Sequence, residues 1–93
     1  MNELKPLRDK IDALDDKIID LLAERMDIVR EVGRIKAQQK LDLIQSDRVV
    51  EVRERNAQRA ANKGVNPELI RTIYTSIIDE AHQMEQIIIS SRS

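Results

Sequence analysis

Positively charged side chains are the residues of this chain that could carry chemistry, and Arg25 is the most informative of them. It stands in a row of residues that follow one another at spacings of three and four, which we call the apolar stripe. The members of the stripe are Leu4, Leu7, Ile11, Leu14, Ile18, Leu21, Arg25, Ile28, Val32 and Ile35. This spacing is typical of a helix that buries one face against other helices. Because a buried guanidinium is costly without an anion, Arg25 predicts a pocket for a small acid.

Three further cations could act together with Arg25. Lys36 follows it by eleven residues, so both lie on one face of a helix, about 16 Å apart along its axis. Arg8 is separated from Lys36 by about 42 Å of the same helix, and it could reach the pocket only from a second subunit in an antiparallel dimer. Arg48 is expected in the first turn of a second helix, where the helix dipole disfavours a cation. A residue that is unfavourable for its position in a helix, as Arg48 is, often has a functional role.

Each of these residues also has a purely structural interpretation. Arg25 could extend its guanidinium to solvent or pair with a carboxylate of another helix. Glu85 could be a carboxylate at the edge of the core that forms a salt bridge. His82 is the only histidine and has no companions suited to hold a metal ion, so we predict no metal site. If Arg25 and Lys36 are unpaired buried charges, their removal should leave stability intact.

The composition excludes several classes of function. Sixteen basic and 17 acidic side chains give a net charge of −1, and Tyr74 is the only aromatic residue. Neither property is typical of a protein that binds nucleic acid. Apolar runs reach only three residues, far below the length of a membrane span, and residues 1–3 lack the features of a signal peptide. The absence of cysteine fits a cytoplasmic protein without disulfides or zinc–thiolate sites.

The abundance of helix-forming residues predicts an all-α fold with three helices in one domain, residues 1–93. The first helix is expected to begin near Pro6, or slightly earlier at Asn2, and to continue to about Lys36. About 33 helical residues span roughly 50 Å, whereas a compact chain of this length is only about 30–35 Å across. The first helix is therefore too long for its own domain, and the sequence predicts a homodimer in which two such helices pack along each other.

Two shorter helices are expected after a loop at residues 38–45. The second covers residues 46–63, with Ser46 as its N-cap and Gly64 in the left-handed position beyond its end. The third begins at Asn66-Pro67, an N-cap followed by proline at the first helical position. Its inward row is expected to contain Ile70, Ile73, Ile77, Ala81, Met84 and Ile88.

With these features in place, the chain resembles the all-helical class of chorismate mutases over essentially its full length. The resemblance is carried by Leu7-Arg8-Asp9-Lys10-Ile11-Asp12, Leu22-Ala23-Glu24-Arg25, Glu31-Val32-Gly33-Arg34-Ile35-Lys36, Ser46-Asp47-Arg48 and Ile77-Ile78-Asp79-Glu80. Each segment alone is weak, but the combination is highly specific. The resemblance implies an intertwined homodimer of three-helix chains with two active sites, each built from both subunits. This agrees with the argument from helix length.

The resemblance also implies an activity and roles for individual residues. The activity is the rearrangement of chorismate, a small dicarboxylate, to prephenate in aromatic amino-acid biosynthesis, an isomerisation that needs no cofactor. Arg25, together with Arg8 of the partner subunit, would bind the two carboxylates, and Arg48 would line the same wall. Lys36 would hydrogen-bond the ether oxygen of the substrate. Glu85, which stands where the family has Gln or Glu, would donate a second hydrogen bond to that oxygen.

Three positions depart from the family pattern and leave the substrate open. Gln45 stands where many members have Asp, Val49 where many have a Glu that accepts the ring hydroxyl, and Ala81 where Ser is common. A similar apolar replacement occurs in the related isochorismate pyruvate-lyase branch, so a lyase that produces salicylate is one alternative. A 4-amino analogue of chorismate is another possible substrate. A third reading, a non-catalytic helical dimer or regulatory module, predicts that Arg25 is buried against a protein carboxylate and that no cavity exists.

Overall fold

The computed structural model describes residues 2–91, which form three helices joined by short loops. These are α1 (Leu4–Gln39), α2 (Ser46–Asn62) and α3 (Pro67–Ser91). Residues 2–91 contain no β-strand, so the prediction of an all-α fold with three helices and a long N-terminal helix is confirmed. Within the same residues, no helix is both long enough and apolar enough to cross a membrane.

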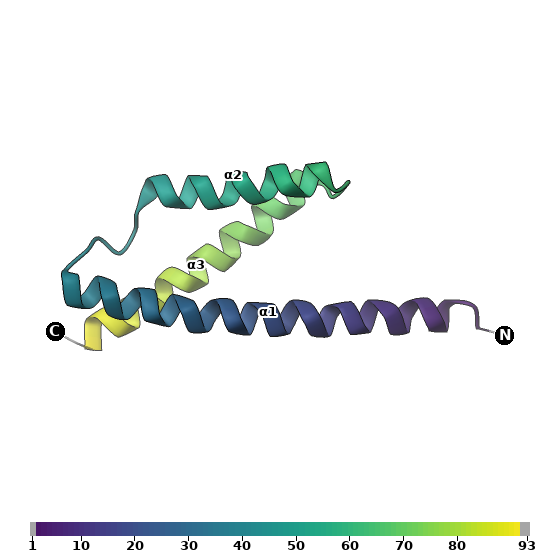
Figure 1. The fold of residues 1–93 in the computed structure, drawn as a ribbon, viewed down its shortest axis with the longest axis horizontal. Coiled ribbons are helices and arrows are strands. Elements are labelled where there is room, and N and C mark those ends of the chain that lie inside the picture. The colour runs from purple at the N-terminus through teal and green to yellow at the C-terminus, as the bar shows by residue number, and fades with distance from the viewer. Residues whose placement is uncertain (1, 92–93) are drawn as a thin grey trace.

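α3 is the helix that holds the chain together. It runs diagonally between the other two helices and packs against both, whereas α1 and α2 stay apart (Figure 1). The N-terminal part of α1 projects away from this arrangement, and every residue from 2 to 21 is exposed. A hollow is therefore bounded by the C-terminal half of α1, the start of α2 and the second half of α3.

The ends of α1 differ slightly from the predicted ones. The helix begins at Leu4, whose backbone N–H donates to the Asn2 side-chain oxygen at 3.1 Å, so the earlier of the two expected starts is the better one. At the other end, Lys40 adopts a left-handed conformation with φ 56°. The backbone N–H groups of Lys40 and Leu41 both donate to the carbonyl of Lys36, and these bonds end the helix.

The junction around α2 confirms two predictions and corrects one. Ser46 is not the N-cap but the first helical residue, and the capping position is held by Gln45 in an extended conformation without a side-chain cap bond. Gly64 has φ 77°, the left-handed conformation expected after a helix end. Asn66 accepts a hydrogen bond from the backbone N–H of Glu68 at 2.9 Å and so caps α3 as predicted.

The buried core of the chain is small. Its apolar members among residues 2–91 are Ala57, Ile78 and Ala81, none of them more than 7% exposed, and Ile78 is not in the predicted inward row. Ile73 was in that row but is 40% exposed. The difference arises because α3 packs against two helices on two sides, so its buried surface does not follow a single row.

Most of the apolar stripe is left exposed by the part of the chain that the structure describes. Leu7, Leu14 and Leu21 are each more than half exposed, and the radius of gyration is 16.9 Å with a longest dimension of 61 Å. A compact chain of this length would have a radius of gyration of about 12 Å. Exposed apolar rows of this size are typical of interfaces. The structure is thus consistent with the length argument, while the dimer itself stays a prediction.

Candidate active site

A cleft of about 360 Å³ lies between the three helices and gathers most of the predicted site residues. Those that line it are Arg25, Lys36, Gln45, Arg48, Val49, Ala81 and Glu85. Arg8 is the exception, because it lies near the far end of α1 and is exposed. The functional roles expected for these residues stay predictions, but residues from three separate segments do meet around one space.

Lys36 and Glu85 form the most buried polar contact of the cleft. The ammonium nitrogen Nζ of Lys36 lies 2.6 Å from Oε1 of Glu85, and the two side chains are only 11% and 5% exposed. The same ammonium donates a hydrogen bond of 2.6 Å to the backbone carbonyl of Leu43. An ammonium has three N–H groups, so Lys36 is tied to α3 and to the loop before α2 and keeps one donor for a ligand.

Glu85 therefore has the salt bridge that its structural interpretation predicted. Its contact with Lys36 has the distance of an ion pair but not the angles of a hydrogen bond. As an ionised carboxylate it can accept hydrogen bonds but cannot donate them. The position of Glu85 in the cleft is also compatible with the expected contact to a substrate oxygen, which would need its protonated form.

Gly33 explains why Glu85 can come so close to α1. A Cβ atom at Gly33 would lie 3.3 Å from the Glu85 Cα and 3.2 Å from Cδ1 of Ile88. Glycine inside a helix costs about 1 kcal/mol relative to alanine. Here that cost is offset by the close approach of two helices, which places Glu85 next to Lys36.

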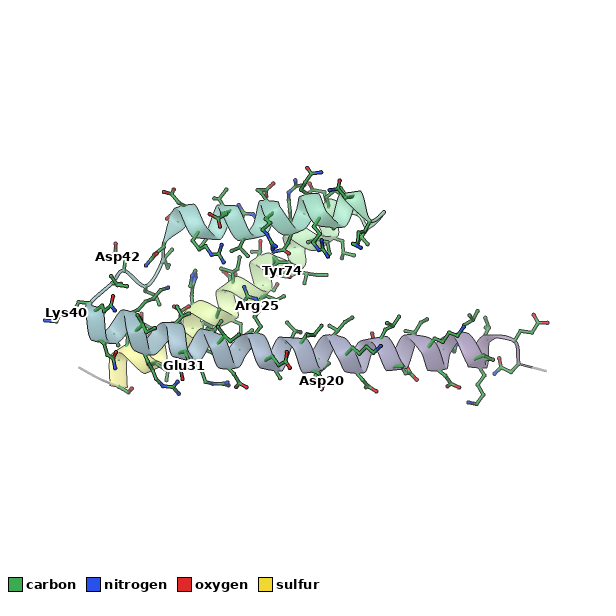
Figure 2. The ribbon with its side chains drawn as sticks, viewed as in Figure 1. Asp20, Arg25, Glu31, Lys40, Asp42 and Tyr74 are labelled. Carbon is green, nitrogen blue, oxygen red and sulfur yellow. The ribbon has the colours of Figure 1, made fainter. Side chains whose placement is uncertain are left out.

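Arg25 is the charged residue of the cleft that lacks a protein partner. It is half-buried, its Nη1 atom is buried without a hydrogen bond, and it forms no ion pair with any residue from 2 to 91. Figure 2 shows it extending from α1 towards α3, on the side where Tyr74 lies. The non-catalytic reading required a carboxylate on Arg25 and no cavity, and neither condition holds in this part of the chain.

The second wall of the cleft comes from the start of α2. Arg48 lies in the first turn of this helix, where it pairs with Glu51 and is 66% exposed at its side chain. Val49 is half-buried and follows it on the wall, while Gln45 reaches only a long hydrogen bond of 3.5 Å to the carbonyl of Asp42. Arg48 and Gln45 are therefore held loosely and can adjust to a ligand.

His82 is a lining residue for which the sequence predicts no role. It lies on α3, half-buried, and belongs to the wall of the cleft. Its spacing of three residues to Glu85 and four to Ile78 places all three on one helix face. This spacing to Glu85 is the signal in the sequence that could have indicated a place in the site. Among residues 2–91, no group of histidine, aspartate or glutamate is arranged to hold a metal ion.

The remaining walls of the cleft are mostly valine, isoleucine and alanine. A small apolar chamber that presents three cations from two helices suits a compact molecule with two carboxylates. The model of one protein family, chorismate mutase type II, matches residues 7–86. The chain belongs to the chorismate mutase type II family. The resemblance inferred from the quoted segments is thereby confirmed at the level of the family.

Individual relatives within the chorismate mutase family differ in their named substrates. The 4-amino-4-deoxychorismate mutase of Streptomyces venezuelae is 33% identical over 92 residues, which cover 99% of this chain and 89% of the relative. The T-protein of Enterobacter agglomerans is 34% identical over 83 residues, or 89% of this chain but only 22% of the relative. The bifunctional chorismate mutase/prephenate dehydratase of Aquifex aeolicus is 34% identical over 89 residues, 92% of this chain and 25% of the relative. These identities fix the family and leave the substrate open.

Proposed function

We propose that this protein is an isomerase that rearranges chorismate to prephenate. The observation that carries the proposal is the convergence of Arg25, Lys36 and Arg48 on one mostly apolar cleft. Chorismate carries two carboxylates and an ether oxygen at which negative charge develops. Three cations match these three features in number and in charge.

The reaction is intramolecular, and the cleft can assist it without taking part in covalent chemistry. The ether C–O bond breaks while a C–C bond forms between the enolpyruvyl methylene and the ring, and no proton is transferred. A snug apolar chamber can hold the side chain over the ring in the reactive conformation. A fixed positive charge beside the ether oxygen stabilises the negative charge that builds up there.

Lys36 is the residue best placed to serve the ether oxygen. Its ammonium is held by Glu85 and the Leu43 carbonyl, so it is preorganised and needs no reorientation when the substrate binds. Arg25, whose buried Nη1 has no hydrogen-bond partner, would bind one carboxylate. Arg48 would exchange its exposed contact with Glu51 for a substrate carboxylate, because a surface ion pair is weak.

The active form would be a homodimer that shares its sites. The exposed apolar stripe of α1 needs a cover, and a second copy of the same helix offers a matching apolar row. In an antiparallel arrangement, Arg8 of the partner subunit would enter the cleft and supply a further cation. Equilibrium sedimentation should then give twice the chain mass, and a folded monomer at micromolar concentration would contradict this architecture.

A second candidate substrate is 4-amino-4-deoxychorismate. Two relatives that are each 33% identical bear the name of that activity. Val49, on the cleft wall, cannot accept a hydrogen bond from a ring hydroxyl. A ring amino group in place of the hydroxyl would need different hydrogen-bond partners on this wall of the cleft.

Incubation of the purified protein with three compounds tests the proposal. Chorismate should yield prephenate, 4-amino-4-deoxychorismate would yield the rearranged amino product, and isochorismate would yield salicylate if the chain were a pyruvate-lyase. The control is Arg25→Ala, which should lose most of whichever activity is found. If none of the three compounds reacts, or if Arg25→Ala is as active as the wild type, the proposed function is wrong.

A further inference from the structure

We propose that His82 contacts the ring substituent of the substrate, a hydroxyl or an amino group, and so discriminates substrates that carry this substituent from those that lack it. This inference rests on the proposed function and deepens it. It gives His82 a role in substrate specificity that is separate from the roles of the cations and of Glu85.

His82 is a polar side chain without a polar partner on a wall of the cleft. It is half-buried, and it forms no hydrogen bond or ion pair with any residue that the structure describes. Its described neighbours on the lining face of α3 are Ile78, which is buried and apolar, and Glu85, which is paired with Lys36. Partly buried polar groups usually find a partner, so an unpartnered imidazole that faces a cleft is suited to meet a ligand.

The charged groups around His82 already have other tasks. Lys36 is bound to Glu85 and to the carbonyl of Leu43, and Arg25 and Arg48 are the cations left for carboxylates. On α3 itself, the charged groups one turn away are Glu85, which pairs with Lys36, and Asp79, which is exposed and does not line the cleft. No charged group of the cleft is therefore left for a ring hydroxyl or amino group.

Two lining residues could in principle meet a ring hydroxyl or amine from the α2 side, and neither is well suited. Val49 has no polar atom. Gln45 is exposed and held only by a long hydrogen bond of 3.5 Å to the carbonyl of Asp42, so it is not preorganised for the substituent. A neutral imidazole has one donor and one acceptor nitrogen, so it can accept from a hydroxyl or amine and can donate to a hydroxyl. His82 is thus the one lining residue in residues 2–91 whose chemistry matches the substituent and which has no other partner.

The test compares each substrate with its analogue that lacks the ring substituent. His82→Leu keeps the bulk of the side chain and removes both nitrogens. It should lower kcat/KM for the substituted substrate by roughly tenfold to a hundredfold, the loss expected when a buried polar group loses its partner. With the analogue that has no ring substituent, the same variant should change kcat/KM by less than about twofold. His82→Gln, which keeps a donor and an acceptor, should retain most of the activity on both compounds.

The matched control is Val52→Ala, another change of a half-buried lining residue. It removes apolar contact only, so its losses should be equal for the substituted and unsubstituted compounds. If His82→Leu lowers kcat/KM equally for the substituted and the unsubstituted compound, His82 contacts a carboxylate or has a merely structural role, and the proposal is overturned. Retention of full selectivity in His82→Leu would overturn it as well.

A binding measurement separates this inference from the proposed function. The probe is a bicyclic dicarboxylate that mimics the rearranging substrate, prepared with and without the ring hydroxyl and titrated into the protein by calorimetry. Wild type should favour the hydroxylated probe, and His82→Leu should lose that preference. If the wild-type protein shows no turnover but this preference holds, the proposed reaction fails and the role of His82 stands. If neither probe binds, both claims are refuted.

Discussion

Removal of the Lys36 ammonium should destabilise the fold, and the contact with Glu85 sets the size of the effect. In Lys36→Met the unbranched apolar stem is retained and the ammonium is lost, so the Glu85 carboxylate, 5% exposed, is left without its partner. Breaking one side of a buried ion pair costs about 3–5 kcal/mol. We expect about 3 kcal/mol, the lower end of this range, because 11% of the Lys36 side chain reaches solvent and water can partly replace it.

This outcome differs from the expectation based on sequence alone, in which both buried cations could be removed without loss of stability. That reasoning treated Lys36 as unpaired, and the structure shows that it is paired with Glu85 and with a backbone carbonyl. It still applies to Arg25, which has no ion pair with any described residue. Arg25→Ala should therefore change the free energy of unfolding by less than about 1 kcal/mol.

The assay is chemical unfolding at a fixed protein concentration, applied as a double-mutant cycle. Lys36→Met, Glu85→Gln and the double variant are compared with the wild type, and Arg25→Ala is the control. The double variant removes both charges and should recover about 2 kcal/mol relative to Lys36→Met alone. If Lys36→Met is as stable as the wild type, or if the double variant is no better than the single one, the buried ion pair does not have the energetic role given to it here.

Three further predictions follow from other contacts. Val49→Glu should raise kcat/KM for chorismate, by at most the equivalent of about 1–3 kcal/mol, because its carboxylate can accept from the ring hydroxyl while His82 donates to it; steady-state kinetics that show no gain would mean that His82 already accepts the hydroxyl proton. Gly33→Ala should lower the melting temperature, because its Cβ would lie 3.3 Å from the Glu85 Cα and overpacking costs about 1–3 kcal/mol, more than the gain of about 1 kcal/mol in helix propensity. The hydrogen bond from Arg71 holds the pKa of Glu54 below its ordinary value of 4.5, so the folded state holds this proton less tightly than the unfolded state. The pair therefore adds stability above pH 4.5 that is lost as the pH falls through the lower folded value. Unfolding curves of Glu54→Gln should show a weaker dependence on pH in that acid range, and an unchanged dependence would contradict the assignment.

The sequence predicted the helices well where local chemistry decides their ends. Gly64 and Asn66 act through their own backbone and side-chain preferences, and both have the predicted conformation or hydrogen bond. Ser46 failed as an N-cap because the loop approaches α2 with Gln45 in the extended conformation. Ile73 is more exposed than the sequence predicted, and Ile78 is buried without having been predicted to be. The path of α3 between two helices is a tertiary property, which helical spacing alone does not reveal.

The sequence also identified most of the residues that meet in the cleft. Arg25 and Arg48 each break an expectation for their place in a helix, Lys36 shares a helix face with Arg25, and the other positions follow from the resemblance to the family. The Lys36–Glu85 contact could not be derived in the same way. It depends on the close approach of α3 to Gly33. This approach brings together Lys36 and Glu85, which are almost fifty positions apart in the chain. A lone histidine belongs to no sequence pattern that predicts a role for it. Only the fold places His82 on the wall of the cleft.

A subunit-mixing experiment tests the central claim most directly, namely that chorismate is rearranged in a cleft completed by Arg8 of the partner subunit. Arg8→Ala and Arg25→Ala are each inactive in this account, since every site of either homodimer lacks one cation. After joint unfolding and refolding in equal amounts, about half of the dimers should be mixed, and each mixed dimer has one intact site out of two. The account predicts that the mixture regains about a quarter of the wild-type rate of prephenate formation. A mixture no more active than its two parents would contradict the shared site.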